Sequence, residues 1–302
     1  MKKLFLFAVC SMLWLCTMSA GMAGAGDEAF ERFIRPVTNP VYFDDARSES
    51  YVHLIYAYQR LPSYIKTTAG RVPLDGNLRV TALALNYAIN ERFTLVAAKD
   101  GYIDCNPDNT KEHGEGWADL AAGLKYAFIR SPAHEFILSG KLLVELSQGS
   151  REVLQGNGSG NIAPSLTFLK GIGSKGQVSG MFGGIIPFNN QEESTVLFDS
   201  WHVSYAVTPK FFPLIELNHF WVVRQARRDD PCSQIAKFEG GDLINLGARH
   251  GTQNRHFVSL AAGARYRCMK NMDIGFAYEF PLSDRHTSLM EDRITFDLIF
   301  RF

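Results

Sequence analysis

The chain has 302 residues, of which 46% are hydrophobic and 12% aromatic, and its 31 lysines and arginines equal its 31 aspartates and glutamates. This balance gives no basic patch of the kind that binds nucleic acid, so no nucleic-acid partner is expected. Beyond the first 25 residues no stretch approaches 18 uncharged apolar residues, which excludes a bundle of membrane helices but leaves ample apolar residues for a membrane β-barrel.

The first 25 residues have the pattern of a secretory signal peptide. Lys2 and Lys3 precede an apolar run from Leu4 to about Met18, and Ala23-Gly24-Ala25 supplies a cleavage site of the A-x-A type. The run is short for a spanning helix, which needs about 20 residues. We therefore predict cleavage near Ala25 and a location in the cell envelope.

The mature chain divides into residues 26–50, predicted as a periplasmic N-terminal segment or plug, and residues 51–302, predicted as the barrel. Twelve segments in the second part alternate apolar and polar residues with a period of two and end at turn residues. An even number is required if both termini lie in the periplasm. The predicted strands are Tyr51 to Gln59, Asn77 to Ile89, Arg92 to Tyr102, Trp117 to Phe128, Phe136 to Ser147, Asn161 to Lys170, Gln177 to Phe188, Leu197 to Val207, Phe211 to Val223, Phe257 to Arg267, Asp273 to Leu282 and Arg293 to Phe302.

The connections between these strands alternate in length. Short ones such as Asn90-Glu91 and Met269 to Met272 fit periplasmic turns, and long ones such as Gly101 to Gly116 and Gln225 to His256 fit external loops. Asp242 to Ala248 could be a thirteenth strand, but parity places it in the long outer loop or in a hairpin extension of it.

The last eleven residues alternate strictly and end on an aromatic residue, Phe302. A soluble sandwich would also bury such an apolar face. The free aromatic end, however, resembles the closing strand of a bacterial outer-membrane barrel, which implies the outer membrane of a Gram-negative bacterium as the location. The resemblance implies that Phe300 and Phe302 are read as an assembly signal, with outer-membrane lipid, the barrel-assembly machinery and periplasmic chaperones as partners. The predicted fold is an all-β, transmembrane, antiparallel up-and-down barrel of about twelve strands.

Charged residues gather on one face of the predicted strands, because a basic side chain facing lipid near the midplane would cost about 2–4 kcal/mol. Six positive residues face six negative ones, which favours a salt-bridged and nearly neutral lumen over a strongly ion-selective one. Arg267, Asp273 and Arg301 are expected to cluster near the periplasmic mouth, the alternative being separate solvated charges. The predicted lumen-lining charges are Lys125, Lys141, Arg265, Arg267, Arg293, Arg301, Asp119, Glu145, Glu216, Asp273, Glu279 and Asp297.

One short pattern resembles an enzyme site. His202-Val203-Ser204 has the His-x-Ser spacing of outer-membrane lipid hydrolases, in which the histidine is the base and the serine the nucleophile. Trp201, Val203 and Tyr205 are predicted to face lipid, so His202 and Ser204 would point into the lumen, away from a lipid substrate. We therefore expect no enzyme activity and keep lipid hydrolysis as a minor alternative.

The cysteine and glycine patterns indicate no catalytic or cofactor-binding site. Cys105 and Cys232 fall in predicted external loops in an oxidising compartment, where a disulfide could persist, the alternative being free thiols. The glycines of residues 156–160 precede a strand and not a helix, so they do not fit a dinucleotide-binding loop. No metal site and no cofactor are expected.

Several short motifs resemble the outer-membrane proteins of the meta-pathway of phenol degradation. They are residues 116–126 (GWADLAAGLKY), the glycine-rich loop 156–160 (GNGSG), 213–217 (PLIEL), 243–247 (LINLG) and 261–266 (AAGARY). The resemblance spans most of the mature chain and implies passive passage of small, aromatic or apolar compounds. It carries over no catalytic residue.

A barrel of twelve strands lies between eight strands, which side chains fill, and 16–18 strands, which leave an aqueous channel. Our first expectation is an outer-membrane channel or transporter for small solutes. The second is a closed structural or adhesive barrel that acts through external loops such as Gln225 to His256. A lumen blocked by Asp27 to Ser50 would favour the second.

Overall fold

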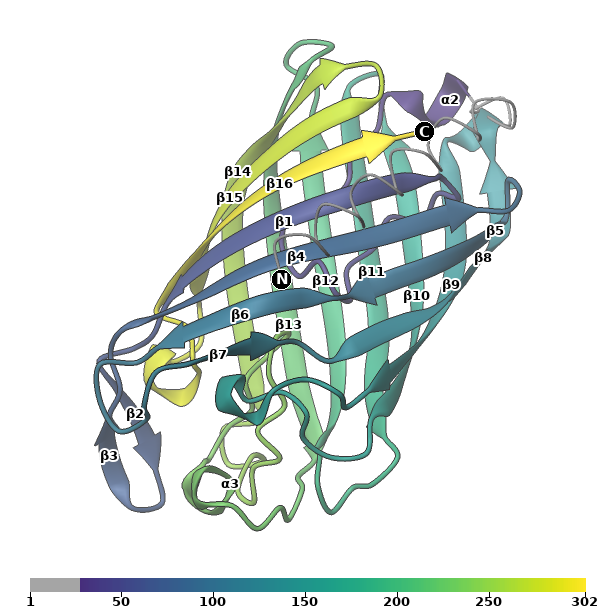
Figure 1. Cartoon of the computed structure of the whole chain (residues 1–302). Helices are drawn as coiled ribbons and strands as arrows, with labels where there is room; N and C mark the ends of the chain where they lie inside the picture. The colour runs from purple at the N-terminus through teal and green to yellow at the C-terminus, as the bar shows by residue number, and fades with distance from the viewer. Residues whose placement is uncertain (1–27) are drawn as a thin grey trace, which may run out of the picture.

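A computed structural model describes residues 28–302, so the predicted signal peptide lies outside the described residues. The chain forms a closed antiparallel β-barrel whose neighbours in the sheet follow chain order (Figure 1). The first strand, β1, pairs with the last, β16, on one side and with β4 on the other, which closes the barrel. Two wall strands are interrupted, one between β5 and β6 and one between β7 and β8, so the predicted count of twelve is confirmed.

Each wall strand lies within a few residues of its predicted position. The twelve are β1 (Tyr51–Arg60), β4 (Asn77–Ala88), β5 (Phe93–Lys99) continued by β6 (Gly101–Asn106), β7 (Gly114–Trp117) continued by β8 (Leu120–Ser131), β9 (Phe136–Leu146), β10 (Asn161–Ile172), β11 (Gly176–Pro187), β12 (Thr195–Tyr205), β13 (Phe211–Arg224), β14 (His256–Met269), β15 (Met272–Pro281) and β16 (Asp292–Arg301). The other elements are α2 (Glu28–Glu31), the hairpin β2 (Tyr64–Thr67) and β3 (Gly70–Pro73), α3 (Pro231–Ile235), and the 3-10 turns η1 (Pro132–His134), η2 (Arg151–Val153) and η3 (Arg285–Thr287). No helix in this part of the chain is long and apolar enough to cross a membrane.

The two ends of the barrel differ in their connections. The turns 89–92, 132–135, 173–175, 206–210 and 270–271 form what we call the short-turn end, where α2 and the C-terminus also lie (Figure 1). The connections 61–76, 107–113, 147–160, 188–194, 225–255 and 282–291 form the loop end. This alternation is the one predicted for a barrel with both termini on one side.

Two details of the loop end differ from prediction. The connection expected from Gly101 to Gly116 is reduced to residues 107–113, because β6 and β7 pair with each other and extend the wall. Cys105 therefore lies in a strand and not in a loop. The hairpin of β2 and β3 was not predicted, because its short segments lack clear alternation. Asp242 to Ala248 adds no wall strand, as parity argued.

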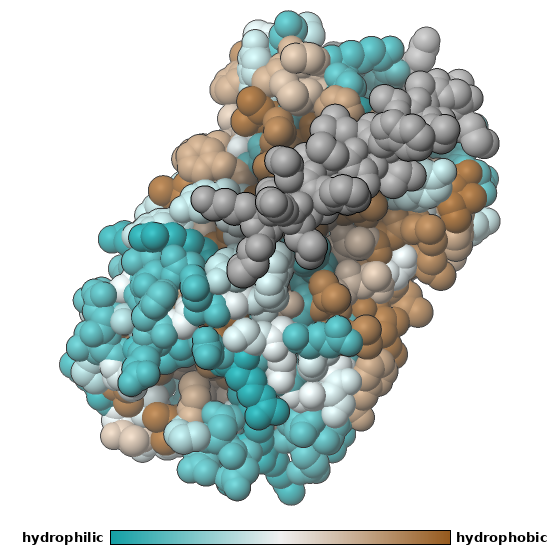
Figure 2. Space-filling model, viewed as in Figure 1, coloured by the Kyte–Doolittle hydropathy of each residue, from teal (hydrophilic) through white to brown (hydrophobic). Residues whose placement is uncertain are grey.

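The outer surface of the wall is apolar. Leu124, Tyr126 and Phe128 on β8 alternate with interior residues, and each keeps at least 43% of its surface exposed. Phe276 and Phe296 face each other across β15 and β16 with ring centroids 5.0 Å apart. Figure 2 shows apolar residues over the wall and mostly hydrophilic residues at the loop end. The period of two thus separates an apolar exterior from a polar interior.

Candidate functional site: the barrel interior

Residues 29–50, which precede β1, lie inside the barrel. Phe33, Ile34, Val37 and Ala46 each expose 1% or less of their surface. Ile34 and Val37 pack with Phe212, Leu214, Ala261 and Ala277 of the wall, whereas Val41, Tyr42 and Phe43 join a second apolar cluster nearer the loop end. We call residues 29–50 the N-terminal segment. It fills space that wall side chains leave open.

Polar side chains of the wall bind the backbone of the N-terminal segment. Glu216 on β13 accepts hydrogen bonds from Val37 N (2.9 Å), Thr38 N (2.8 Å) and Thr38 Oγ1 (2.6 Å). Arg265 on β14 donates to the carbonyl oxygens of Arg35 (3.1 Å) and Pro36 (3.0 Å). A buried segment without regular secondary structure must find partners for its backbone groups, and here the wall supplies them.

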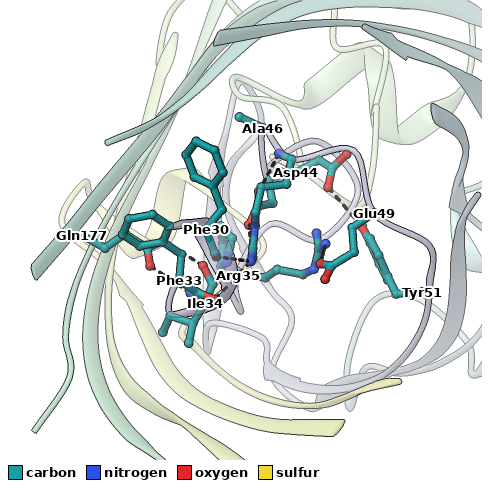
Figure 3. A network of polar contacts seen from close by, with 12 residues as sticks. Phe30, Phe33, Ile34, Arg35, Asp44, Ala46, Glu49, Tyr51 and Gln177 are labelled. Carbon is teal, nitrogen blue, oxygen red and sulfur yellow. Dashed lines mark hydrogen bonds and ion pairs between the residues drawn. The ribbon is translucent and has the colours of Figure 1, made fainter. Parts of the chain in front are cut away.

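The opposite side of the wall holds the segment in the same way. Lys125 Nζ donates to the Asp44 carboxylate (2.8 Å) and to Asp45 O (2.7 Å), and Lys141 Nζ donates to Tyr42 O (2.8 Å). Gln177 forms a double contact with Ile34, its amide donating to the carbonyl at 2.7 Å and its oxygen accepting from the amide at 2.9 Å (Figure 3). These contacts surround the segment from several strands.

Contacts within the N-terminal segment also stabilise its bend. Arg47 donates to the carbonyl oxygens of Phe30 (3.1 Å) and Phe33 (3.2 Å) and pairs with Asp45 at 2.6 Å. Arg35 pairs with Glu49, and its guanidinium lies 3.9 Å from the centre of the Tyr51 ring (Figure 3). Burial alone would raise the pKa of Asp44, but Lys125, Lys141 and Arg35 outweigh it and lower that pKa to about 2. The N-terminal segment is therefore held in the barrel by ion pairs and hydrogen bonds as well as by apolar packing.

The predicted lumen-lining residues point into the interior, where ten of the twelve are buried and Arg267 and Arg301 are half-buried at the short-turn end. The predicted cluster of Arg267, Asp273 and Arg301 forms, with Asp273 bonded to Arg267 at 3.2 Å and to Arg301 at 2.6 Å. Arg265 pairs with Asp297, which also contacts His53 at 2.8 Å. Their role in passage of solutes remains a prediction.

The structure adds charged residues that the strand pattern did not reveal. Asp242 and Glu239 come from the long connection 225–255, which folds toward the interior, and Arg293 on β16 pairs with Asp242 at 2.7 Å. Lys99 lies 3.0 Å from Glu145, but the unclear alternation of its strand hid its direction. Glu193 is buried in the short connection 188–194. No periodic pattern in a loop could have placed these groups.

Little open space remains inside. A pocket at the loop end, lined by Tyr42, Glu193 and Asp242, has a volume of about 30 Å³. Pockets between the N-terminal segment and the wall have volumes of about 20 and 40 Å³. Each water molecule needs roughly 10–15 Å³ measured in this way, so these pockets hold only a few water molecules. A wider depression of about 500 Å³ lies at the short-turn end beside Arg32 and Arg267.

His202 and Ser204 on β12 are buried in the interior, whereas Trp201, Val203 and Tyr205 are exposed on the outer face. His202 Nδ1 lies 2.7 Å from Glu216 Oε1, within the group that binds the N-terminal segment. His202 Nε2 is buried without a partner among the described residues. Neither side chain reaches the outer surface, where a membrane lipid would lie.

Cys105 and Cys232 are free thiols in the structure, so the predicted bridge is not formed there. Cys105 is buried in the apolar cluster at the loop end, and the half-buried Cys232 packs against the same cluster. The strand position of Cys105 explains why it is not an exposed loop thiol. The bridge stays a prediction. The described residues contain no group of three or more His, Cys, Asp or Glu side chains arranged to hold a metal ion.

Comparison with known proteins identifies the fold. Neither a protein-family model nor a curated protein sequence matches the chain, so its relation to the meta-pathway family stays a prediction. Among solved structures, an outer membrane channel from Pseudomonas putida F1 matches with a TM-score of 0.61 and 14% identity over 84% of this chain and 96% of that one. The NanC porin in a rhombohedral crystal form matches with a TM-score of 0.52 and 9% identity over 83% and 100%. The chain thus shares the β-barrel fold of outer-membrane channels.

Proposed function

We propose that this protein is an outer-membrane channel for small solutes, held closed by its N-terminal segment in the conformation described. One observation carries the proposal: residues 29–50, which precede the first wall strand, lie inside the barrel and fill much of the space between the wall side chains. A barrel that served only as a solid scaffold would need no removable filler. Withdrawal of residues 29–50 would leave a lumen lined by the groups that now bind them and narrowed at the loop end by the connection 225–255.

The apolar exterior supports a membrane location. Exposed Leu, Phe, Tyr and Trp side chains on the strands form a continuous outer surface, which soluble proteins rarely leave uncovered. The predicted signal peptide and the terminal Phe302 agree with export to the outer membrane. The short-turn end would then face the periplasm and the loop end the exterior.

Aromatic side chains inside the barrel support passage of aromatic or apolar solutes. Phe198, Phe220 and Phe257 point inward from three strands and are covered by Tyr42, whose ring centroid lies 4.9 Å from that of Phe198. Once Tyr42 leaves with its segment, these rings would line the lumen. This arrangement matches the solute class implied by the family resemblance.

The test is single-channel conductance in a planar bilayer. We expect the refolded mature chain to be mostly silent and a variant lacking residues 28–47 to show stable steps. Addition of a synthetic peptide of residues 28–47 to the short-turn side is the matched control and should restore closure. Silence of the deletion variant, with its strands verified by circular dichroism, would remove the channel proposal.

Two other functions have a specific observation in their favour. Residues 29–50 block the lumen, and this is the outcome that the sequence analysis names in favour of a closed structural or adhesive barrel acting through its external loops. Silence of both chains would favour that function over the channel. The pair His202 and Ser204 fits a lipid hydrolase by spacing alone. Loss of lipid deacylation in Ser204→Ala would establish that activity, and we expect none to be lost.

The C-terminal aromatic residues are proposed as an assembly signal. Phe300 on β16 is 40% exposed on the outer face, and the strand ends at the short-turn end beside α2. Deletion of Phe302 should reduce insertion in cells more than refolding in detergent, because only the first process uses the assembly machinery. An equal effect on both would point to a purely structural role.

A further inference from the structure

The pocket at the loop end contains more negative than positive charge. Five carboxylates line it, those of Asp119, Glu145, Glu193, Glu239 and Asp242, against two cationic side chains, Lys99 and Arg255. The balanced lumen expected from the strands therefore does not extend to this end, because three of the five carboxylates come from the connections 188–194 and 225–255.

Partners account for four of the five carboxylates. Asp119 accepts from the amides of Gly149 and Gly156, both at 2.8 Å, and Glu145 pairs with Lys99. Glu239 accepts from Leu246 N at 2.7 Å and Ala248 N at 2.8 Å. Asp242 pairs with Arg293 on β16. These four groups are structural.

Glu193 is different. It exposes only 2% of its surface, and its Oε2 atom is buried without a hydrogen-bond partner among residues 28–302. Its carboxylate packs against the glycine-rich loop: a Cβ added at Gly158 would lie 2.6 Å from Glu193 Cδ and 2.7 Å from Oε2. An unpaired buried carboxylate is costly unless it is neutralised, so Glu193 requires a proton or a cation as its neutralising partner.

We propose that this pocket binds a small ammonium ion, the free form or the head group of an organic amine, with Glu193 as the anionic partner. The aromatic rings of Tyr42, Phe220 and Phe257 also line the pocket, and such rings attract ammonium groups through their faces. Its volume of about 30 Å³ accepts a group the size of roughly two water molecules. The inference rests on the proposed channel function and gives its closed state an amine ligand, because Tyr42 of the N-terminal segment lines the pocket.

Protons compete with the cation at this site. Burial raises the pKa of Glu193 to about 8, assisted by the nearby Glu145 and Asp119 and opposed by Lys99 and Arg228. The other titratable or charged groups that face the same pocket are Tyr42, Glu239, Asp242 and Arg255. Near neutral pH the ammonium ion must displace a proton from Glu193, so its binding should strengthen about tenfold between about pH 7 and about pH 9.

The experiment is calorimetric titration of the refolded mature chain with methylammonium chloride at these two pH values. We expect binding that strengthens with pH and releases a proton only at the lower pH. Tetramethylammonium chloride, which is too large for the pocket, should not bind. Equal affinity at both pH values, or equal binding of tetramethylammonium, would overturn the proposal, and neither measurement requires a variant.

The variant Glu193→Gln should weaken methylammonium binding by about tenfold or more, because it removes the unpaired charge. Its matched control is Glu192→Gln, which changes the neighbouring carboxylate that accepts from Ser159 Oγ at 2.9 Å. Unchanged affinity in Glu193→Gln would refute the assignment.

Calorimetry does not require an open pore, so the two proposals can fail separately. Methylammonium binding together with a silent segment-deletion variant would keep the site and remove the channel. Stable conductance without methylammonium binding would keep the channel and remove the amine site.

Discussion

The two halves of the interior are filled in different ways. At the short-turn end the wall charges are matched by the N-terminal segment, and Glu216, Arg265 and Lys125 each bind it directly. At the loop end the filler is the connection 225–255, which the chain tethers on both sides, and carboxylates are in excess. If the signal peptide is cleaved as predicted, the N-terminal segment is joined to the wall only through β1 and can be withdrawn, whereas the connection 225–255 is joined at both ends and can only loosen in place.

Removal of Glu216 should weaken the binding of the N-terminal segment to the wall at the short-turn end. Glu216→Ala deletes the acceptor of three hydrogen bonds from Val37 and Thr38 and leaves His202 without its carboxylate. Loss of one member of a buried charged group typically costs 3–5 kcal/mol, so we expect the free energy of unfolding in urea to fall by about 3 kcal/mol and the open probability to rise.

Glu115→Ala is the control for this variant, since Glu115 is exposed on β7. It should change the free energy of unfolding by no more than about 0.5 kcal/mol. A silent bilayer and unchanged unfolding in Glu216→Ala would show that the segment does not depend on this contact.

Removal of a buried carboxylate from the connection 225–255 should loosen the loop end without opening the channel. Glu239→Ala removes the acceptor of bonds from Ser194 Oγ, Leu246 N and Ala248 N. Trypsin should cleave after Lys237 severalfold faster because the connection loosens, but conductance should stay low because both of its ends remain attached. Open channels in Glu239→Ala would contradict the distinction between the two fillers.

Low pH should also weaken the binding of the N-terminal segment to the wall, but by less than the loss of Glu216. The pKa of Asp44 is about 2, below the ordinary value of about 3.9, so its charge stabilises docking above the ordinary value and that stabilisation is lost as pH falls through about 2. Burial opposes ionisation of Asp45 and Glu49 as well, but neighbouring arginines lower their pKa values. Open probability should therefore rise between about pH 4 and about pH 2. In Asp44→Asn the rise should be smaller, and an identical acid response would exclude Asp44 as its source.

The smallest expected effect is on the reactivity of the Cys232 thiol at the loop end. Burial raises the pKa of Cys232 to about 11, and the thiolate is the reactive form. Maleimide near pH 8 should therefore modify Cys232 more slowly in the folded protein than in urea, as mass spectrometry of peptides would measure. A shift of gel mobility on reduction would instead show that Cys232 and Cys105 form the predicted bridge.

Strand alternation made the wall predictable from sequence. In a barrel the interior and exterior sides follow from a period of two, so Lys125, Arg265 and Asp297 could be placed inward from their apolar neighbours alone. The pairing of Arg267, Asp273 and Arg301 was also predictable, because a tight turn at residues 270–271 fixes the register of β14 and β15.

The filling of the barrel could not be predicted in the same way, because the sequence left open whether residues 26–50 form a periplasmic segment or a plug. The N-terminal segment has no regular secondary structure from Thr38 to Ser50, and its position depends on hydrogen bonds to β8, β9, β13 and β14 that join residues far apart in the chain. Glu193, Glu239 and Asp242 lie in connections without periodicity, so nothing in their local sequence gives their direction.

The sequence by itself determined the barrel, its twelve strands, its two unlike ends and the direction of most wall side chains, because each follows from local alternation and turn length. Only the tertiary structure decided that the interior is occupied, which wall charges bind the N-terminal segment, and that Glu193 Oε2 has no hydrogen-bond partner within residues 28–302. Those outcomes depend on long-range contacts between irregular segments and the wall, whose geometry no local pattern encodes.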